Sequence, residues 1–206
     1  MKSILIGAGG HGRVLMEAHL PFQFDAILDS KPGILKVAGV PIIGGDEKLS
    51  QLTEQGFTHF AIGVGSAKSC ALRARLFVAA VAAGLEPHSI LHPTAYISPS
   101  AVCGAGYQIL PKAVIHTNAQ LGDHVLVNSA AVIEHDCIIG AHCHIATGAI
   151  ICGHVTIGEE THIGAGAVVR QGIRIGAGAI IAAGAVVVKD VSDGCTVVGV
   201  PARSLE

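Results

Sequence analysis

The residues that decide the fold are VNSAAVIEHDCIIGAHCHIATGAII, at positions 127–151. Every sixth residue of this stretch is Val or Ile, and an apolar residue keeps the same spacing over positions 97–187. A second, mostly small residue follows four positions later, as at Ala131 and Cys137. A period of six fits neither a helix, which repeats about every 3.6 residues, nor simple strand alternation. The repeat therefore predicts a coil of short strands joined by corners, an all-β parallel β-helix, over residues 97–188.

The repeat also predicts which residues stack on one another. Glycines follow many of the large aliphatic residues, as at Gly122 and Gly140, and we expect them at corners that need backbone freedom. Three hexads make one triangular turn of about 18 residues, so residues 18 apart lie about 4.8 Å from each other. The general rule for parallel strands favours right-handed crossovers, so this argument leaves the hand of the coil open. The pairs that stack by this count are His124 with His142, His144 with His162, and His135 with Gly153.

The length of the chain favours one large or two modest domains, and its cysteines favour a cytoplasmic protein. The chain has 206 residues, with 13 Lys and Arg against 15 acidic residues and no basic cluster, so we expect no nucleic-acid or membrane partner. The mean hydropathy of +0.59 comes from the repeats. No apolar run reaches the roughly 18 residues of a membrane span, and the N-terminus is too short for a signal peptide. The six cysteines form no CxxC pair, which indicates reduced core thiols.

Residues 1–88 predict a separate α/β domain, half of a Rossmann fold. The first strand ends in GAGGHG at positions 7–12, whose GxGxxG spacing lets a phosphate approach backbone N–H groups at a helix N-terminus. Half of a dinucleotide fold suits one nucleotide or nucleotide-sugar better than NAD; a tight turn that binds nothing is the alternative. A linker at 89–96 and a C-terminal tail at 189–206 complete the chain. The expected strands are 2–6, 25–28, 40–43 and 59–64, and the expected helices are 13–20, 46–55 and 67–83.

The candidate catalytic residue of the repeat is His135, a general base, because imidazole titrates near neutral pH. Asp136 would hold its far nitrogen and raise its basicity. Adjacent residues on a regular strand face opposite sides, so this pairing requires a corner, and Glu134 is the alternative partner. Gly153 could offer a backbone N–H to a developing oxyanion. The polar residues expected to project outward here, where a neighbouring subunit would complete a cleft, are Asn128, Glu134, His135, Asp136, His142, His144 and His154.

Three stretches resemble one family of bacterial enzymes. NSAAVIEHDC at 128–137, GAGGHG at 7–12 and VGVPAR at 198–203 are similar to the NeuD/PglD-type sugar O- and N-acetyltransferases, and the likeness covers the whole chain. The resemblance implies a left-handed coil and a homotrimer with acetyl-CoA between adjacent coils, without a metal. The bacillosamine-pathway enzymes, which look most similar, imply N-acetylation of the 4-amino group of a UDP-linked amino-dideoxy sugar.

The resemblance also implies roles for individual residues. His135 would deprotonate the sugar amine with the help of Asp136, and the oxyanion would form near the Gly153 amide. The residues that would place acetyl-CoA are Asn128, His144, Gly153, Ala165 and Ala183. The residues that would hold the UDP-sugar are Gly9, Gly10, His11, Asp29, Ser30 and Gly63; Asp29 stands about twenty residues beyond the glycines, where an acid commonly meets a ribose or base.

Other functions remain open from the sequence. O-acetyl transfer of the sialic-acid type would use the same pair of residues. Trimeric β-helical carbonic anhydrases bind zinc through histidines, and the stacked pairs His144/His162 and His124/His142 could be such ligands, although this leaves the N-terminal domain without a role. A nucleotide-binding scaffold without catalysis is the third alternative.

Overall fold

The chain folds into two compact units, which are described separately. The computed structural model describes residues 2–18, 23–31, 33, 35–66 and 68–205. The first unit comprises residues up to 65 together with 72–90, and the second comprises 66–71 together with 91–206. The short segment 66–71 therefore belongs with the coil, although it lies within the N-terminal part of the sequence.

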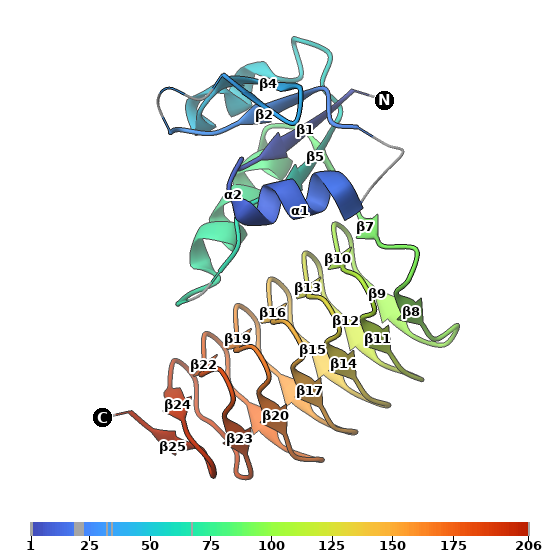
Figure 1. Cartoon of the computed structure of the whole chain (residues 1–206), viewed down its shortest axis with the longest axis vertical. Helices are drawn as coiled ribbons and strands as arrows, with labels where there is room; N and C mark the ends of the chain where they lie inside the picture. Colours follow the sequence, from blue (N-terminus) through green and yellow to red (C-terminus); the bar gives the residue numbers. More distant parts are fainter. Residues whose placement is uncertain (1, 19–22, 32, 34, 67, 206) are drawn as a thin grey trace. The chain divides into compact units, whose positions relative to one another are not determined.

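The N-terminal unit is a six-stranded sheet with helices (Figure 1). The strand order is β3-β4-β2-β1-β5-β6, and only the β3–β4 pair is antiparallel. The strands are β1 (Ser3–Ile6), β2 (Ala26–Leu28), β3 (Lys36–Val37), β4 (Val40–Gly44), β5 (His59–Ile62) and β6 (Glu86–Pro87). The helices are α1 (Gly10–Ala18), the 3-10 helix η1 (Asp46–Gln51) and α2 (Ala71–Ala82). The α/β class predicted for this part is confirmed.

Both faces of the central strands are buried. Ile4 and Ile6 of β1 share a core cluster with Phe77 and Ala80 of α2. The side chain of the residue between Ile4 and Ile6 points to the other face of the sheet, where α1 lies with its buried Leu15 (Figure 1). Burial on two sides explains why these strands are continuous apolar runs rather than alternating ones.

Several boundaries in this unit differ from those expected. The helix expected over 46–55 is a 3-10 helix that ends at Gln51, and the helix expected over 13–20 already begins at Gly10. The helix expected from 67 begins at Ala71, whose N–H donates to the Ser69 hydroxyl at 3.1 Å. Residues 19, 20 and 67 lie outside the described residues. The strand expected over 59–64 ends at Ile62, because the next residue is a glycine packed against the glycine turn.

The second unit is a left-handed parallel β-helix with three flat sides (Figure 1). Strands 18 residues apart pair in parallel, such as Leu126 with His144 and His144 with His162. This confirms the predicted coil and its stacking.

The eight-stranded side contains β7 (Ile90–Leu91), β10 (Gln108–Ile109), β13 (Leu126–Val127), β16 (His144–Ile145), β19 (His162–Ile163), β22 (Ile180–Ile181), β24 (Thr196–Val198) and β25 (Arg203–Ser204). The six-stranded side contains β8 (Tyr96–Ile97), β11 (Val114–Ile115), β14 (Val132–Ile133), β17 (Ile150–Ile151), β20 (Val168–Val169) and β23 (Val186–Val187). The five-stranded side contains β9 (Val102–Cys103), β12 (Gln120–Leu121), β15 (Ile138–Ile139), β18 (Thr156–Ile157) and β21 (Arg174–Ile175).

The interior of the coil is built from large and small residues in turn. Ile133 and Cys137, like the corresponding pairs of other hexads, are fully buried in one continuous cluster. Thr161 is a polar residue at a small inward position, and its hydroxyl donates to the Gly176 carbonyl at 2.7 Å. The core therefore tolerates this hydroxyl because it is hydrogen-bonded.

The glycines that follow the large aliphatic residues are required for a different reason from the one expected. Their φ angles are not in the left-handed region; instead, a Cβ on Gly140 would lie 2.5 Å from the backbone nitrogen of Glu159 in the next coil. The left-handed corner residue comes two positions later, and non-glycine residues also occupy it, as at Asn118 and Asp136. Close approach of successive coils, rather than backbone freedom, explains the first set of glycines.

Replacing Gly140 by alanine is expected to destabilise the coil by about 1–3 kcal/mol or more, because the added methyl group meets backbone atoms that cannot move aside. Gly148 is the matched control: its φ is +66° and a Cβ there would have no neighbour within 4 Å. Gly148→Asn should therefore cost less than about 1 kcal/mol. Urea unfolding followed by circular dichroism measures both free energies of unfolding. Equal losses in the two variants would contradict the close-approach explanation.

Both ends of the coil extend beyond the repeat seen in the sequence. The segment 89–96, expected to be a linker, contains β7, which pairs with the eight-stranded side. The segment 189–206, expected to be a tail, adds β24, whose Thr196 pairs with Ile180, 16 residues earlier rather than 18. This shorter turn breaks the six-residue register while Val197 still joins the core. No helix in the described part of the chain has the length and hydropathy needed to cross a membrane.

Candidate active site

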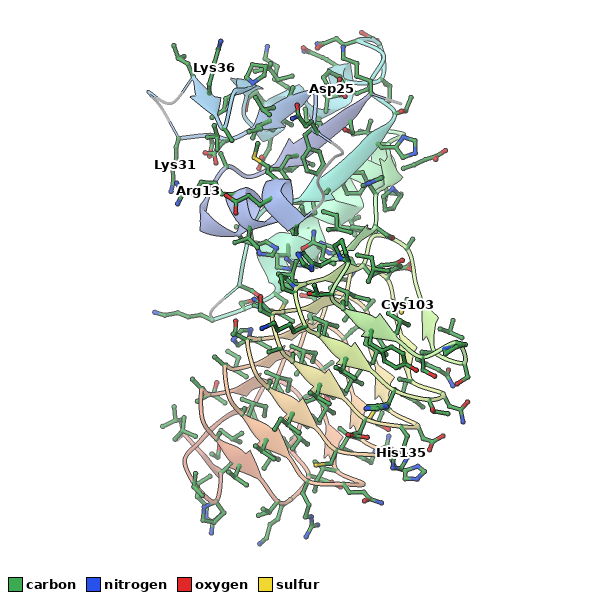
Figure 2. All side chains as sticks on the ribbon, turned by 45° about the vertical axis from the view of Figure 1, so that its right-hand side comes forward. Arg13, Asp25, Lys31, Lys36, Cys103 and His135 are labelled. Atoms are coloured by element: carbon green, nitrogen blue, oxygen red, sulfur yellow. The ribbon has the colours of Figure 1, made fainter. Side chains whose placement is uncertain are left out.

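The corner after β14 brings His135 and Asp136 together. Asp136 has φ = +58°, a left-handed conformation that interrupts strand alternation and lets two adjacent side chains meet. His135 Nδ1 lies 2.8 Å from Asp136 Oδ2. Figure 2 shows His135 at the outer surface of the coil, and its side chain is about half exposed at 46%. The corner that this pair was expected to need is present.

Asp136 is the hydrogen-bond partner of His135, and Glu134 has a different neighbour. The Glu134 Oε1 atom lies 3.9 Å from His116 Nε2. The pKa of the Asp136 carboxyl is lowered, first by the hydrogen bond from His135 and then by one from Asn118. An ionised carboxylate can only accept hydrogen bonds, so Nδ1 of His135 carries the proton and Nε2 keeps its lone pair when the ring is neutral.

The ring of His135 lies against Gly153, as the 18-residue count predicts. A Cβ on Gly153 would lie 2.5 Å from both Cε1 and Nε2 of His135. The neighbouring His154 donates its backbone N–H to the His135 carbonyl at 3.0 Å, and its ring meets the His135 ring edge to face at 5.0 Å. The absence of a side chain at position 153 thus leaves room for the imidazole with Nε2 over the glycine.

Asn128 and His144 also meet, but on the eight-stranded side of the coil. Asn128 Nδ2 lies 3.2 Å from His144 Nε2, and His144 Nδ1 lies 2.7 Å from the Ser66 hydroxyl. His144 projects outward from the coil, because the neighbouring Ile145 is the inward residue, but only 5% of it is exposed. Ser66 therefore covers the His144 ring, and Cys70, which also groups with the coil, lies 3.6 Å from the Thr161 carbonyl. No spacing in the sequence could have indicated Ser66, because it lies 78 residues before its partner.

Ala165 and Ala183 lie at successive exposed corners of the coil. The Gly184 N–H donates to the Ala165 carbonyl at 2.8 Å, which fixes the stacking of the two corners. Small side chains at both positions leave the backbone there accessible.

The N-terminal unit contains a cavity of about 570 Å³ at the glycine turn. All six residues expected to hold a nucleotide-sugar line it: Gly9, Gly10, His11, Asp29, Ser30 and Gly63. Gly9 and Gly10 have open space where a Cβ would be, whereas a Cβ on Gly12 or Gly63 would collide with the Gly7 carbonyl oxygen. The first two glycines therefore leave backbone open to a ligand, and the others allow the turn to pack.

The charges of this cavity were only partly expected. The backbone N–H groups of Ala8 and Lys31 donate to the two carboxylate oxygens of Asp29 at 2.7 and 2.8 Å. Lys31 and Arg75 line the cavity and suit an anionic phosphate, and sequence reasoning missed both. Arg75 could not be told from the nearby Arg73 by sequence. Burial separates them, because Arg73 is fully buried and donates to the Val64 carbonyl at 2.9 Å.

His135, Asp136 and His154 could together hold a metal ion, since one ligand atom from each lies within 4.8 Å of the others. However, the 2.8 Å between His135 Nδ1 and Asp136 Oδ2 is a hydrogen-bond distance, shorter than the roughly 3.4 Å between ligands on a tetrahedral zinc ion. Among the described residues, the stacked pairs His124/His142 and His144/His162 belong to no group of three such ligands. The geometry of the described residues thus favours acid-base chemistry over the zinc alternative.

Comparisons with known proteins agree on both parts of the chain. Residues 2–78 match the family described as PglD N-terminal domain. Residues 118–153 and 154–189 match the family described as bacterial transferase hexapeptide (six repeats). No curated protein sequence gives a match.

Solved structures resemble the whole chain. PerB from Caulobacter crescentus, in complex with CoA and GDP-perosamine, is 35% identical, with 100% of this chain and 98% of that chain covered and a TM-score of 0.93. A histidine-to-alanine variant of GDP-perosamine N-acetyltransferase from the same organism is 34% identical, with 100% and 97% covered and a TM-score of 0.94. The acetyltransferase domain of PglB from Neisseria gonorrhoeae, in complex with acetyl coenzyme A, is 38% identical, with 99% and 98% covered and a TM-score of 0.88.

A PglD-type α/β domain joined to a hexapeptide coil defines a hexapeptide-repeat acyltransferase. The chain belongs to the PglD/NeuD-type family of sugar acetyltransferases, as the resemblance in the sequence predicts.

Proposed function

We propose that this protein transfers the acetyl group of acetyl-CoA to the amino group of a nucleotide-linked amino sugar, with a UDP-linked 4-amino-dideoxy sugar as the expected acceptor. Similarity to the perosamine and PglB acetyltransferases supports the reaction class. The observation that carries the proposal is the hydrogen bond between His135 Nδ1 and Asp136, because it leaves Nε2 as a base at the outer surface of the coil.

The proposed chemistry begins when His135 Nε2 accepts a proton from the sugar amine as its nitrogen attacks the thioester carbonyl carbon. The resulting oxyanion is stabilised by the Gly153 N–H, which a glycine leaves uncovered. The C–S bond then breaks, and the proton on His135 passes to the departing thiolate. The products are an N-acetylated sugar and CoA.

The two co-substrates are assigned to different parts of the molecule. Acetyl-CoA contacts Asn128, Ala165 and Ala183 along the coil, and the buried His144 helps to place it through the Asn128 amide, which its Nε2 contacts. The nucleotide lies in the cavity of the glycine turn, with its phosphates near Lys31 and Arg75 and its sugar near His11.

The active assembly is proposed to be a homotrimer with acetyl-CoA between neighbouring coils. Val102 and Ile138 support an interface, because they stand exposed on the five-stranded side at 63% and 49%. Large apolar side chains on a flat, regular face are suited to a neighbouring copy of the same coil.

The proposal is tested by incubating the protein with acetyl-CoA and a panel of UDP-, GDP- and dTDP-linked 4-amino sugars. We expect release of free CoA thiol with at least one of them, most rapidly with a UDP-sugar, and an amide carbonyl in the product by NMR. Matched nucleotide-sugars with a 4-hydroxyl group in place of the amine serve as controls. Thiol release with the hydroxyl sugars alone would favour O-acetyl transfer, and no release with any sugar would contradict the proposal.

A further inference from the structure

Asn118 lies one coil before Asp136 and contacts its carboxylate. The two residues are 18 apart and both adopt the left-handed corner conformation, with φ of +57° and +58°. Asn118 Nδ2 donates to Asp136 Oδ1 at 3.2 Å, and His135 Nδ1 donates to the other oxygen, Oδ2, at 2.8 Å. Each carboxylate oxygen of Asp136 therefore accepts from its own donor, one on the same coil and one on the preceding coil.

The second donor matters because Asp136 is at the surface. Its side chain is 37% exposed, so water competes for both oxygens and the carboxylate plane could rotate away from His135. A donor on Oδ1 fixes that plane while Oδ2 faces the imidazole. Asn118 is itself anchored, because its backbone N–H donates to the Ser100 hydroxyl at 3.2 Å.

The other charged or titratable groups around Asp136 do not replace this contact. His154 Nε2 lies 3.7 Å from Oδ2, the oxygen already bound to His135, and not from Oδ1. Glu134 and His116 face each other at 3.9 Å. The Asn118 amide is thus the neutral, pH-independent donor that approaches Asp136 from the preceding coil.

We propose that Asn118 is a positioning residue of the acetyltransferase: by holding the Asp136 carboxylate, it keeps neutral His135 in the form protonated at Nδ1, with Nε2 as the base. The proposal rests on the proposed function of His135. It adds a residue that touches neither substrate and acts through Asp136.

A backbone role is the competing explanation for an asparagine at this corner, because asparagine tolerates positive φ better than most residues. Asn118→Gly separates the two explanations, since glycine adopts the same φ without strain but lacks the amide. Lys112→Gly is the matched control, because Lys112 occupies the equivalent corner of another hexad with φ = +60°. Asn118→Asp keeps the shape of the side chain and removes the donor.

Steady-state kinetics are expected to show an approximately tenfold lower kcat for Asn118→Gly, with KM for both substrates changed by less than about twofold. Asn118→Asp should lose at least as much activity, because a second carboxylate would face Asp136. Lys112→Gly should match the wild type. A wild-type kcat in Asn118→Gly, or an equal loss in Lys112→Gly, would overturn the proposal.

Ring nitrogen-15 spectra of His135, assigned by their loss in His135→Gln, provide a readout that does not depend on activity. At a pH where the ring is neutral, we expect the wild type to be protonated at Nδ1 and Asn118→Gly to show a mixture of both tautomers. Unchanged tautomers in Asn118→Gly would contradict the positioning role. If His135→Gln remained active, the proposed function of His135 would fail, while these spectra would still decide whether Asn118 controls the ring.

Discussion

Replacing His135 by glutamine is expected to lower kcat for acetyl transfer by about 10²–10⁴-fold, the usual contribution of a general base. Glutamine retains a polar side chain of similar length but cannot accept and return a proton at neutral pH. The effect should fall on kcat rather than on nucleotide affinity, because the cavity proposed to hold the nucleotide is formed by residues of the N-terminal unit.

The measurement is steady-state thiol release, with nucleotide-sugar binding followed separately by calorimetry. His92→Gln is the matched control. His92 lies at the beginning of the coil, and its Nδ1 is within hydrogen-bond distance, 2.9 Å, of the Thr94 hydroxyl. Its replacement should therefore leave kcat within about twofold of the wild type. A kcat above one tenth of the wild-type value in His135→Gln would place the base elsewhere.

Replacing Gly153 by alanine is expected to lower kcat by about 10²-fold without unfolding the coil. The new methyl group would lie 2.5 Å from the Cε1 and Nε2 atoms of His135, so the ring must move away from its position over residue 153. Because the ring is half exposed, it can move into solvent at little cost in stability, but its hydrogen bond to Asp136 would then be lost. The φ of Gly153 lies outside the left-handed region, so alanine strains no backbone there.

A double-mutant cycle separates this effect from other consequences of the methyl group. If Gly153→Ala acts only by displacing His135, it should cause no further loss of kcat in the His135→Gln background. Thermal unfolding checks that the single variant remains folded, with a Tm expected within a few degrees of the wild type. Additive losses would show that the methyl group acts in another way, such as by covering the Gly153 N–H.

Comparison of the sequence with the structure shows what a six-residue period can and cannot predict. The period predicts the inward residues and the stacking of His135 on Gly153, because strands of constant length repeat at constant height. It fails at the end of the coil, where β24 pairs 16 residues after β22 instead of 18. Regular spacing reveals a coil only where no turn is shortened.

Side-chain contacts around the candidate site were predictable only in part. The Asp136 pairing followed from adjacency once a corner was assumed, whereas the choice against Glu134 needed the φ of +58° at residue 136. The contact of Ser66 with His144 joins residues with no periodic relation. The partner of a surface polar group depends on rotamers and backbone angles, which the order of residue types does not encode.

Residue spacing alone predicts an α/β domain followed by a hexapeptide coil, and it also predicts the height on the coil at which His135 lies. These features follow from spacing, because apolar residues must be buried at regular intervals. Three contacts are visible only in the folded chain: Asp136 faces His135, Asn118 of the previous coil donates to the same carboxylate, and Ser66 contacts the buried His144. Those outcomes depend on left-handed corner residues and on chain segments that meet only after folding.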